Sequence, residues 1–94
     1  MAITLKFVGA LRHASGAENL SVECGKTALL MDVIEEAAKA APDLRQNLLD
    51  EHLMETKPNA LILVNGREIS VLKGLKTRVK DGDEVVFVPV VHGG

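Results

Sequence analysis

Apolar and polar residues alternate in two short segments near the beginning of the chain. Residues 3–7 read Ile-Thr-Leu-Lys-Phe and residues 20–23 read Leu-Ser-Val-Glu, with a loop over residues 9–19 between them. A period of two residues is typical of a strand with one buried face. We therefore expect two strands here, paired antiparallel with each other.

The period changes to that of a helix over residues 29–41. Apolar residues recur three and four positions apart, and the charged residues lie off this stripe. Thr27 is the expected N-cap, and Pro42 is expected to end the helix because the residue before a proline avoids the helical conformation. The expected stripe consists of Leu30, Val33, Ile34, Ala37 and Ala41.

A second, shorter helix is expected over residues 43–53, followed by a loop over residues 55–59. The leucines at 44, 48 and 49 are its expected inward-facing side chains.

The second half of the chain contains a run of strand and turn signals. Residues 60–64 are continuously apolar, which is typical of a central strand covered on both faces. Asn65-Gly66 predicts a tight hairpin, because both central residues of such a turn need positive φ. The remaining expectations are a short strand over 67–69, an irregular segment over 71–79 with a helical turn near Leu75, a tight turn at 81–83 and a last strand over 84–90.

This order of elements predicts an α+β fold. A mixed sheet of four to five strands packs over one main helix, with a short second helix, because the apolar faces of sheet and helix cover each other. No internal repeat interrupts the chain, so residues 1–94 are expected to form one domain with residues 90–94 as an exposed C-terminal tail.

Composition narrows the classes of function. The chain has 94 residues, 47% of them apolar, a net charge of −2, three histidines, one cysteine and neither Trp nor Tyr. So little titratable chemistry favours a soluble carrier, modifier or binding module over an enzyme. The single Cys24 excludes an intramolecular disulfide and indicates a reducing, intracellular setting. The chain also shows no signal peptide and no apolar run long enough to span a membrane.

Charge is distributed unevenly along the chain. Residues 32–55 are predominantly acidic, whereas residues 67–80 carry five bases against one acid. Two solvated faces explain this pattern, and docking of the basic stretch onto an acidic partner is the competing interpretation. RNA binding by the basic stretch is a third interpretation, and it predicts an affinity that falls steeply with salt.

The last eleven residues, EVVFVPVVHGG, carry the most specific signal. Pro89 lacks a backbone donor and stiffens the point where the tail leaves the body. Gly93 and Gly94 have no Cβ atoms and therefore form the thinnest tail that a chain can present. A carboxylate on such a tail can enter a narrow channel in another protein. A merely flexible end is the alternative interpretation.

The whole chain resembles the ubiquitin-like β-grasp sulfur carriers. That family includes the small subunit of molybdopterin synthase, the thiamine sulfur carrier, the ubiquitin-related modifier and the archaeal small modifier proteins. The resemblance rests on ITLKFVGALRHASG, on a helix ending at Pro42-Asp43-Leu44, and on VKDGDEVVFVPVVHGG with its terminal diglycine. The thiamine carrier fits less well, because residues 43–59 add a helical segment, and the HGG ending is similar to that of the ubiquitin-related modifier.

The resemblance implies that the reactive group is the terminal carboxylate of Gly94. A ubiquitin-activating-type enzyme adenylates it with ATP and magnesium, and sulfur then converts it to a thiocarboxylate, so the carrier needs no stably bound cofactor and no catalytic residue of its own. Gly93 corresponds to the penultimate glycine, which lets the tail enter the partner's active site. Val90, Val91 and His92 correspond to the part of the tail that lies inside the partner's channel. Further interface candidates are Phe87, Val88, Pro89, Arg67, Lys76 and Arg78. Phe87 and Val88 lie on opposite faces of the last strand, one toward the core and one toward a partner, and alternation does not say which is which.

The expected function is therefore sulfur donation, either to a molybdopterin precursor or to a thiolated tRNA nucleoside. In the first case the expected partner is the large subunit of molybdopterin synthase, in a heterotetramer. Conjugation of Gly94 to lysines of target proteins is the first alternative, and a non-covalent interaction module is the second. The expected location is the cytoplasm. No metal site is expected, because His13 and His52 lack ligand spacing. Cys24 is interpreted as a structural thiol rather than a persulfide relay.

Overall fold

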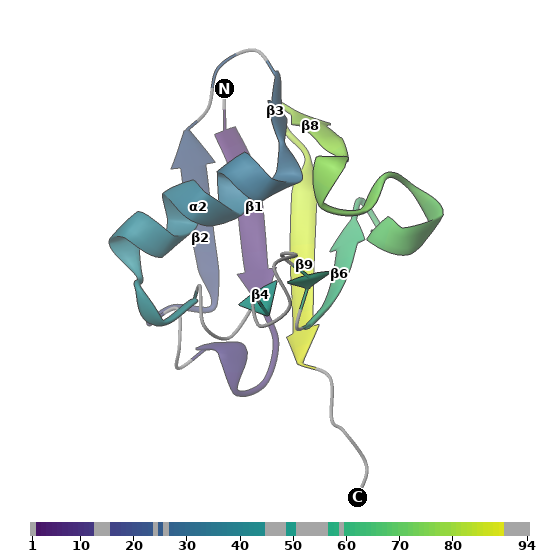
Figure 1. The fold of residues 1–94 in the computed structure, drawn as a ribbon. Coiled ribbons are helices and arrows are strands. Elements are labelled where there is room, and N and C mark those ends of the chain that lie inside the picture. The colour runs from purple at the N-terminus through teal and green to yellow at the C-terminus, as the bar shows by residue number, and fades with distance from the viewer. Residues whose placement is uncertain are drawn as a thin grey trace, which may run out of the picture.

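The computed structural model describes residues 2–12, 16–23, 25, 27–44, 49–50, 57–58 and 60–89, and Figure 1 shows the arrangement of the elements. The elements in chain order are β1 (Ala2–Phe7), β2 (Asn19–Glu23), β3 (Thr27–Leu29), α2 (Leu30–Ala40), β4 (Leu49–Asp50), β5 (Lys57–Pro58), β6 (Ala60–Val64), β7 (Arg67–Glu68), the 3₁₀ turns η1 (Ile69–Val71) and η2 (Gly74–Lys76), β8 (Arg78–Lys80) and β9 (Glu84–Pro89).

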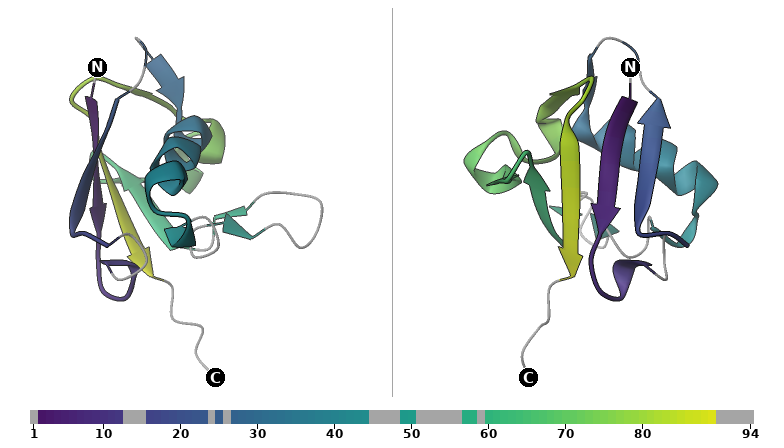
Figure 2. Two further views of the ribbon diagram at one scale, coloured as in Figure 1. Left: turned by 90° about the vertical axis from the view of Figure 1, so that its left-hand side faces the viewer. Right: turned by 180° about the vertical axis from the view of Figure 1, so that it is seen from behind.

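Five of the strands form one mixed sheet in the order β2-β1-β9-β6-β7. The two longest strands, β1 and β9, run parallel at the centre, and the other pairs are antiparallel. Helix α2 crosses only one face of this sheet, and the other face is open (Figure 2). The predicted mixed sheet over one main helix is confirmed, as is the antiparallel pairing of the first two strands.

Alternate residues of the central strands build the core beneath α2. The rings of Phe7 and Phe87, which are register partners on β1 and β9, stack with centroids 5.3 Å apart and an interplanar angle of 12°. Stacked aromatic pairs at such a distance contribute beyond the area that they bury. The helix contributes the side chains of Leu30, Val33, Ile34, Ala37 and Ala38. The predicted stripe therefore forms the buried face, with Ala41 packed at its edge.

The helix does not begin with the predicted cap. Thr27 lies in β3, and the N-cap position belongs to Leu29, which makes no side-chain cap hydrogen bond. Instead the backbone N–H of Leu30 donates to the carbonyl oxygen of Thr77 at 2.8 Å. A tertiary contact therefore satisfies one of the free N–H groups in the first turn of the helix, and sequence patterns do not record such a contact.

The second helix was predicted too long. Asp43 and Leu44 are helical and Leu44 is fully buried, but Leu49–Asp50 forms β4 and pairs antiparallel with β5. Hydrogen bonding to a partner strand overrides the leucine spacing at this point. Leu48 and residues 51–53 lie outside the described part of the chain.

Strand β6 was wrongly predicted to be covered on both faces. It lies second from one edge of the sheet, and Leu61 is 40% exposed on the open face. The central position belongs to β9. A continuous apolar run therefore indicated a strand correctly but did not indicate how many of its faces are covered.

The turn predictions are confirmed. Asn65 and Gly66 have φ angles of 49° and 85°, and Gly82 has a φ of 85° in the turn before β9. Strand β8, within the segment expected to be irregular, pairs antiparallel with β3 and was missed, as was β3 itself. In the described ranges no helix is long and apolar enough to cross a membrane.

Candidate functional site

Strand β9 leads to the predicted tail and is bound on both sides over most of its length. Residues 84–87 pair with β1, and residues 85–89 pair with β6. The backbone N–H of Val8 donates to the carbonyl oxygen of Phe87 at 3.0 Å, which extends the pairing beyond the end of β1. The end of β9 is thereby held at a fixed place on the sheet.

Gly9 lies close to the ring of Pro89. Gly9 has a φ of +61°, and a Cβ atom at this position would lie 3.3 Å from Cγ of Pro89. A side chain at position 9 would therefore meet both an unfavourable backbone conformation and a crowded neighbour. The loop after β1 thus passes close to the last described residue, at the end of β9 nearest the chain terminus.

The open face of the sheet carries an apolar patch next to this exit. Because Val85 and Phe87 face the core, the residues between and after them face the other way. Val88 pairs with Leu61, and Val86 pairs with Leu63, so the four side chains are neighbours across two strands. We call Leu61, Leu63, Val86 and Val88 the open-face patch.

Polar groups border this patch on one side. Nζ of Lys6 lies 3.1 Å from a carboxylate oxygen of Glu84, and both side chains are almost half exposed. A polar border around an exposed apolar centre is the usual anatomy of a protein-binding surface. The patch was missed from the sequence, because residues 60–64 were expected to be buried on both faces.

The predicted interface residues do not all lie together. Val88 and Pro89 are half-buried and lie at the end of β9. Phe87 is fully buried and stacked on Phe7, so its assignment to the interface is wrong: the strand's alternation points it into the core.

The predicted basic residues form a separate surface. Arg67 and Arg78 are exposed and, with Lys80, line one hollow of about 440 Å³. Arg67 pairs with Val64, which in turn pairs with Val85 near the start of β9. Four residues of strand, about 13 Å, separate that position from Pro89. Lys76 is exposed on η2 and does not line this hollow.

The described residues contain no cluster equipped for catalysis. No group of three His, Cys, Asp or Glu side chains could hold a metal ion in this part of the chain. The buried polar residues Thr77 and Asp83 use their side chains within turns. The Thr77 hydroxyl donates to the carbonyl of Gly74 at 2.6 Å, and the Asp83 carboxylate accepts from the Lys80 N–H at 2.9 Å.

Two surface groups have shifted pKa values for local reasons. The pKa of Glu68 is lowered because the backbone N–H and the hydroxyl of Ser70 both donate to its carboxylate. The pKa of Lys39 is raised by its hydrogen bond and charge interaction with Glu36, at 2.8 Å. Both shifts arise from neighbours within four residues, and neither group lies on the open-face patch.

The predicted tail residues Val90, Val91, His92, Gly93 and Gly94 lie outside the described residues, as do His13, Cys24 and His52. Their expected roles remain predictions.

A central last strand beside an open apolar sheet face, in a mixed five-stranded sheet over one main helix, is typical of a small carrier or modifier with a β-grasp fold. The comparisons with known proteins agree. The model of the ThiS family matches residues 5–94, and the chain belongs to this family of small sulfur carriers and modifiers, which are not enzymes.

Three relatives illustrate the likeness. Small archaeal modifier protein 3 of Haloferax volcanii is 31% identical over 94 residues, which is 100% of both chains. A candidate sulfur carrier protein of Archaeoglobus fulgidus is 50% identical over 40 residues, which is 43% of this chain and 46% of that protein. The solution structure of small archaeal modifier protein 1 from Methanosarcina acetivorans superposes with a TM-score of 0.80 at 28% identity and covers 99% of this chain and 96% of that one.

The family match confirms the predicted fold and the predicted carrier or modifier class. One argument from the sequence fails: the chain was set apart from the thiamine carrier by a helical segment over residues 43–59, and parts of that segment are strands β4 and β5.

Proposed function

We propose that this protein is a cytoplasmic sulfur carrier whose reactive group is the terminal carboxylate of Gly94. The observation that carries the proposal is the placement of β9. It is paired with β1 up to Phe87 and with β6 up to its end at Pro89, five residues before Gly94, in a chain that the family model matches through residue 94. The reactive end therefore follows directly from the most constrained strand of the sheet.

The chemistry begins with activation by a separate adenylating enzyme. A carboxylate oxygen of Gly94 attacks the α-phosphorus of ATP, which is bound with magnesium in the partner, and pyrophosphate leaves. A sulfide sulfur then attacks the carbonyl carbon and displaces AMP, so that a thiocarboxylate forms. The partner supplies the positioning and the charge stabilisation.

The body of the protein acts as a docking element. Val88, Pro89 and the open-face patch lie where the chain leaves the sheet, and a partner that binds them meets residues 90–94 at once. In this proposal Val90, Val91 and His92 line the partner's channel, and Gly93 allows the carboxylate to enter it. Phe87 contributes from within the core by fixing β9.

The basic hollow offers a second contact to the same partner. Arg67 and Arg78 lie toward the start of β9, and Lys76 is exposed nearby in the sequence. We propose that these charges steer the encounter with an acidic surface and thereby raise the rate of association more than the affinity.

The acceptor of the sulfur is proposed from the family resemblance. A molybdopterin precursor is one candidate, with this chain bound to the large subunit of molybdopterin synthase in a heterotetramer. A tRNA nucleoside that undergoes thiolation is the other. Purification of the tagged protein from its native cells distinguishes them, because co-purification of the large subunit is expected only in the first case.

Conjugation to proteins is a second candidate function, and one observation favours it. The relative that matches along its whole length is named a small archaeal modifier protein. In this reaction the acceptor is a lysine amine of a target protein instead of sulfide. The product is an isopeptide bond between that amine and the carbonyl carbon of Gly94. Both reactions share the adenylate, so one protein can serve both.

Mass spectrometry of the protein and of its native proteome tests the two functions together. Exchange of one oxygen for sulfur at the C-terminus supports sulfur carriage, and Gly-Gly remnants on lysines support conjugation. If deletion of Gly93-Gly94 leaves ATP–pyrophosphate exchange by the activating enzyme intact, both are wrong and a non-covalent interaction module remains.

A further inference from the structure

Two hollows meet on the side of the molecule where η1, η2 and β8 lie, opposite the β2 edge of the sheet (Figure 1). One is the basic hollow of about 440 Å³. The other has a volume of about 380 Å³ and is lined by Val71, Leu72, Lys73, Thr77 and Arg78. Leu72, Thr77 and Arg78 line both hollows. The two are therefore parts of one surface, and we call the residues that line either of them the η1–β8 groove.

The second hollow offers a place for an apolar side chain. Val71 is 75% exposed, more than any other large apolar residue in the described part of the chain, and its neighbour Leu72 is only partly buried. Ile69 begins the same 3₁₀ turn and is buried, so the turn is anchored at one end and presents Val71 at the other. An apolar side chain of a partner that covered Val71 and Leu72 would remove apolar surface from water.

The rim of the groove is basic. Lys73 lines the apolar hollow, Arg67 and Lys80 line the other one, and Arg78 lines both. All four side chains are exposed, and none of them makes a salt bridge or a side-chain hydrogen bond with another described residue. The acid among the lining residues, Asp83, is buried and accepts hydrogen bonds within its turn. The positive charges of the groove are therefore available to a ligand.

The floor between the two hollows is already ordered. Thr77 is buried, and its hydroxyl accepts from the Lys73 N–H at 3.1 Å. The same hydroxyl donates to the carbonyl of Gly74 at 2.6 Å. The Thr77 carbonyl accepts from the N–H of Leu30 at 2.8 Å, which ties the floor to the start of α2. A groove fixed in this way needs little ordering when a ligand binds, and this lowers the cost of association.

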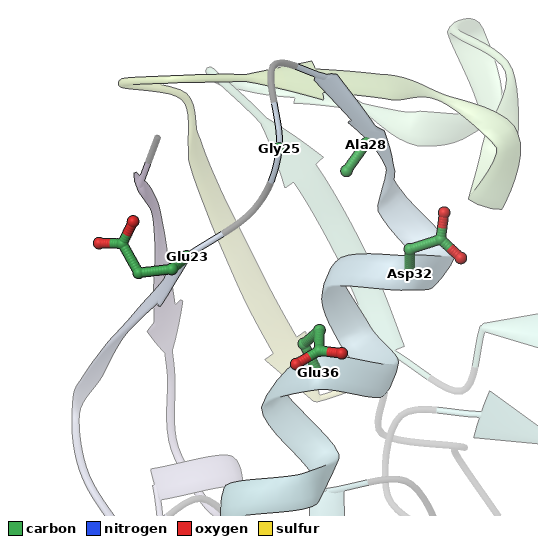
Figure 3. Close-up of a pocket in the computed structure, with 5 residues that line it drawn as sticks. All are labelled: Glu23, Gly25, Ala28, Asp32 and Glu36. Atoms are coloured by element: carbon green, nitrogen blue, oxygen red, sulfur yellow. The ribbon is translucent and has the colours of Figure 1, made fainter.

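A hollow beside α2 has the opposite lining. Its volume is also about 440 Å³, and its lining residues are Glu23, Gly25, Ala28, Asp32 and Glu36, with no base among them (Figure 3). Carboxylates repel an acidic ligand, whereas the exposed bases of the η1–β8 groove attract one. Charge therefore directs an acidic ligand to the η1–β8 groove and away from the hollow beside α2.

We propose that the η1–β8 groove binds a short acidic segment of a partner protein that carries one apolar anchor residue. The anchor covers Val71 and Leu72, and the acidic side chains lie along Arg67, Arg78 and Lys80. A nucleic acid would match the charges, but it stacks its bases on aromatic side chains, and none of the residues that line the groove is aromatic. Steering, as proposed above, uses only the charge of this surface, whereas a bound segment adds an apolar contact and does not depend on the tail.

The test titrates the isotope-labelled full chain with a terminally blocked peptide in which glutamates flank one central leucine. The salt concentration is about 0.1 M, so charges more than about 10 Å away are largely screened. The largest backbone amide shifts are expected over residues 67–80. Arg78→Gln is expected to weaken binding about two- to fivefold, the contribution of one exposed ion pair. Lys39→Gln, which removes one positive charge on α2, is the matched control and is expected to leave binding unchanged.

Two changes test the apolar contact. Val71→Thr keeps the shape of the side chain and is expected to weaken binding about fivefold, because a hydroxyl must lose water beside the anchor. Val8→Thr, the same change at a valine that is 40% exposed outside the groove, is the control and is expected to leave binding unchanged. A peptide in which glutamine replaces the leucine is expected to bind about tenfold more weakly, since its anchor is no longer apolar.

Several outcomes overturn the proposal. They are the absence of saturable shifts over residues 67–80, equal binding of the leucine and glutamine peptides, equal weakening by Arg78→Gln and Lys39→Gln, and shifts confined to the open-face patch. A short single-stranded RNA that binds the same residues more tightly than the peptide would assign the groove to nucleic acid instead. Deletion of Gly93-Gly94 is expected to leave peptide binding intact, so failure of the groove and failure of the proposed function are distinguishable.

Discussion

The side-chain amide of Asn65 joins the hairpin turn to the start of β9 by donating from Nδ2 to Oδ1 of the buried Asp83 at 2.9 Å. The same amide accepts from the backbone N–H of Glu84 at 2.9 Å, and the Asn65 N–H donates to the Glu84 carbonyl at 2.8 Å. One residue in a left-handed conformation therefore both makes the turn and positions the first residue of the central strand.

The first prediction follows from the hydrogen bonds that join Asn65 to Asp83 and Glu84. Asp83→Ala removes the acceptors for Asn65 and for the Lys80 N–H, and it is expected to lower the free energy of unfolding by about 2–3 kcal/mol, since donors are left without partners. Chemical denaturation measures the change. Asp81→Ala, which removes only an exposed acceptor for the Ala2 N–H, is the control and is expected to cost about 1 kcal/mol or less. Equal losses in the two variants would contradict the role given to Asp83.

The second prediction concerns Gly9 and Pro89. Gly9→Ala places a Cβ atom 3.3 Å from the proline ring at a φ of +61°. The left-handed conformation alone is expected to lower the free energy of unfolding by about 1–2 kcal/mol. The close approach to the proline ring is expected to lower it further. Gly16→Ala, with a φ of +77° and no atom within 4 Å of the added Cβ, measures the conformational cost alone.

The extra cost at Gly9 should depend on the ring of Pro89. Pro89→Ala in the Gly9→Ala background is therefore expected to reduce the difference between the two glycine variants. If Gly9→Ala and Gly16→Ala lower the free energy of unfolding equally, both with Pro89 and with Pro89→Ala, the approach of Gly9 to the proline ring does not contribute to stability.

The third prediction separates docking from folding. Leu61→Asp puts a charge in the open-face patch and is expected to raise the KM of the activating enzyme for the carrier about tenfold, the size of a central interface contact. The free energy of unfolding is expected to change little, because Leu61 is 40% exposed. Val71→Asp introduces the same charge at an apolar residue that is 75% exposed on η1, outside the patch. An equal rise in KM for both variants would remove the patch from the interface.

The fourth prediction concerns pH. Because hydrogen bonds from Ser70 lower the pKa of Glu68 in the folded protein, its ionised form contributes stability above the ordinary pKa of a glutamate. That contribution is lost as the pH falls through the lowered value. Glu68→Gln is therefore expected to be less stable than the native protein at neutral pH, and the difference is expected to shrink as the pH falls below the ordinary pKa of a glutamate, about 4.3. A difference that stays constant or grows in acid would contradict the assignment.

Local sequence signals predicted the elements that depend on local chemistry. Alternation indicated β1 and β2, the helical stripe indicated α2, and Asn65-Gly66 indicated its turn, because each depends on neighbouring residues alone. The strands β3 and β8 were missed. Each has three residues, and they form only because they pair with each other across about fifty positions of sequence.

Only the part of the candidate site that depends on neighbouring residues could be predicted from the sequence. The end of β9 and its proline could be read from the sequence, because the motif is contiguous. The open-face patch could not, since it needs the register that sets Leu61 beside Val88 and Leu63 beside Val86. The burial of Phe87 also depends on register: alternation offered two faces, and only the neighbouring Phe7 determines which one is the core.

The position of β9 also bears on how the protein is made. The sheet closes around a strand that follows every other described element in the sequence, so a ribosome releases the centre of the fold last. Until β9 has emerged, β1 and β6 have no common neighbour and the apolar face of α2 has only part of its cover. A chain cut short before β9 is therefore expected to lack the folded sheet. In the proposed function, only a chain that has reached the final strand would present both the docking surface and the tail.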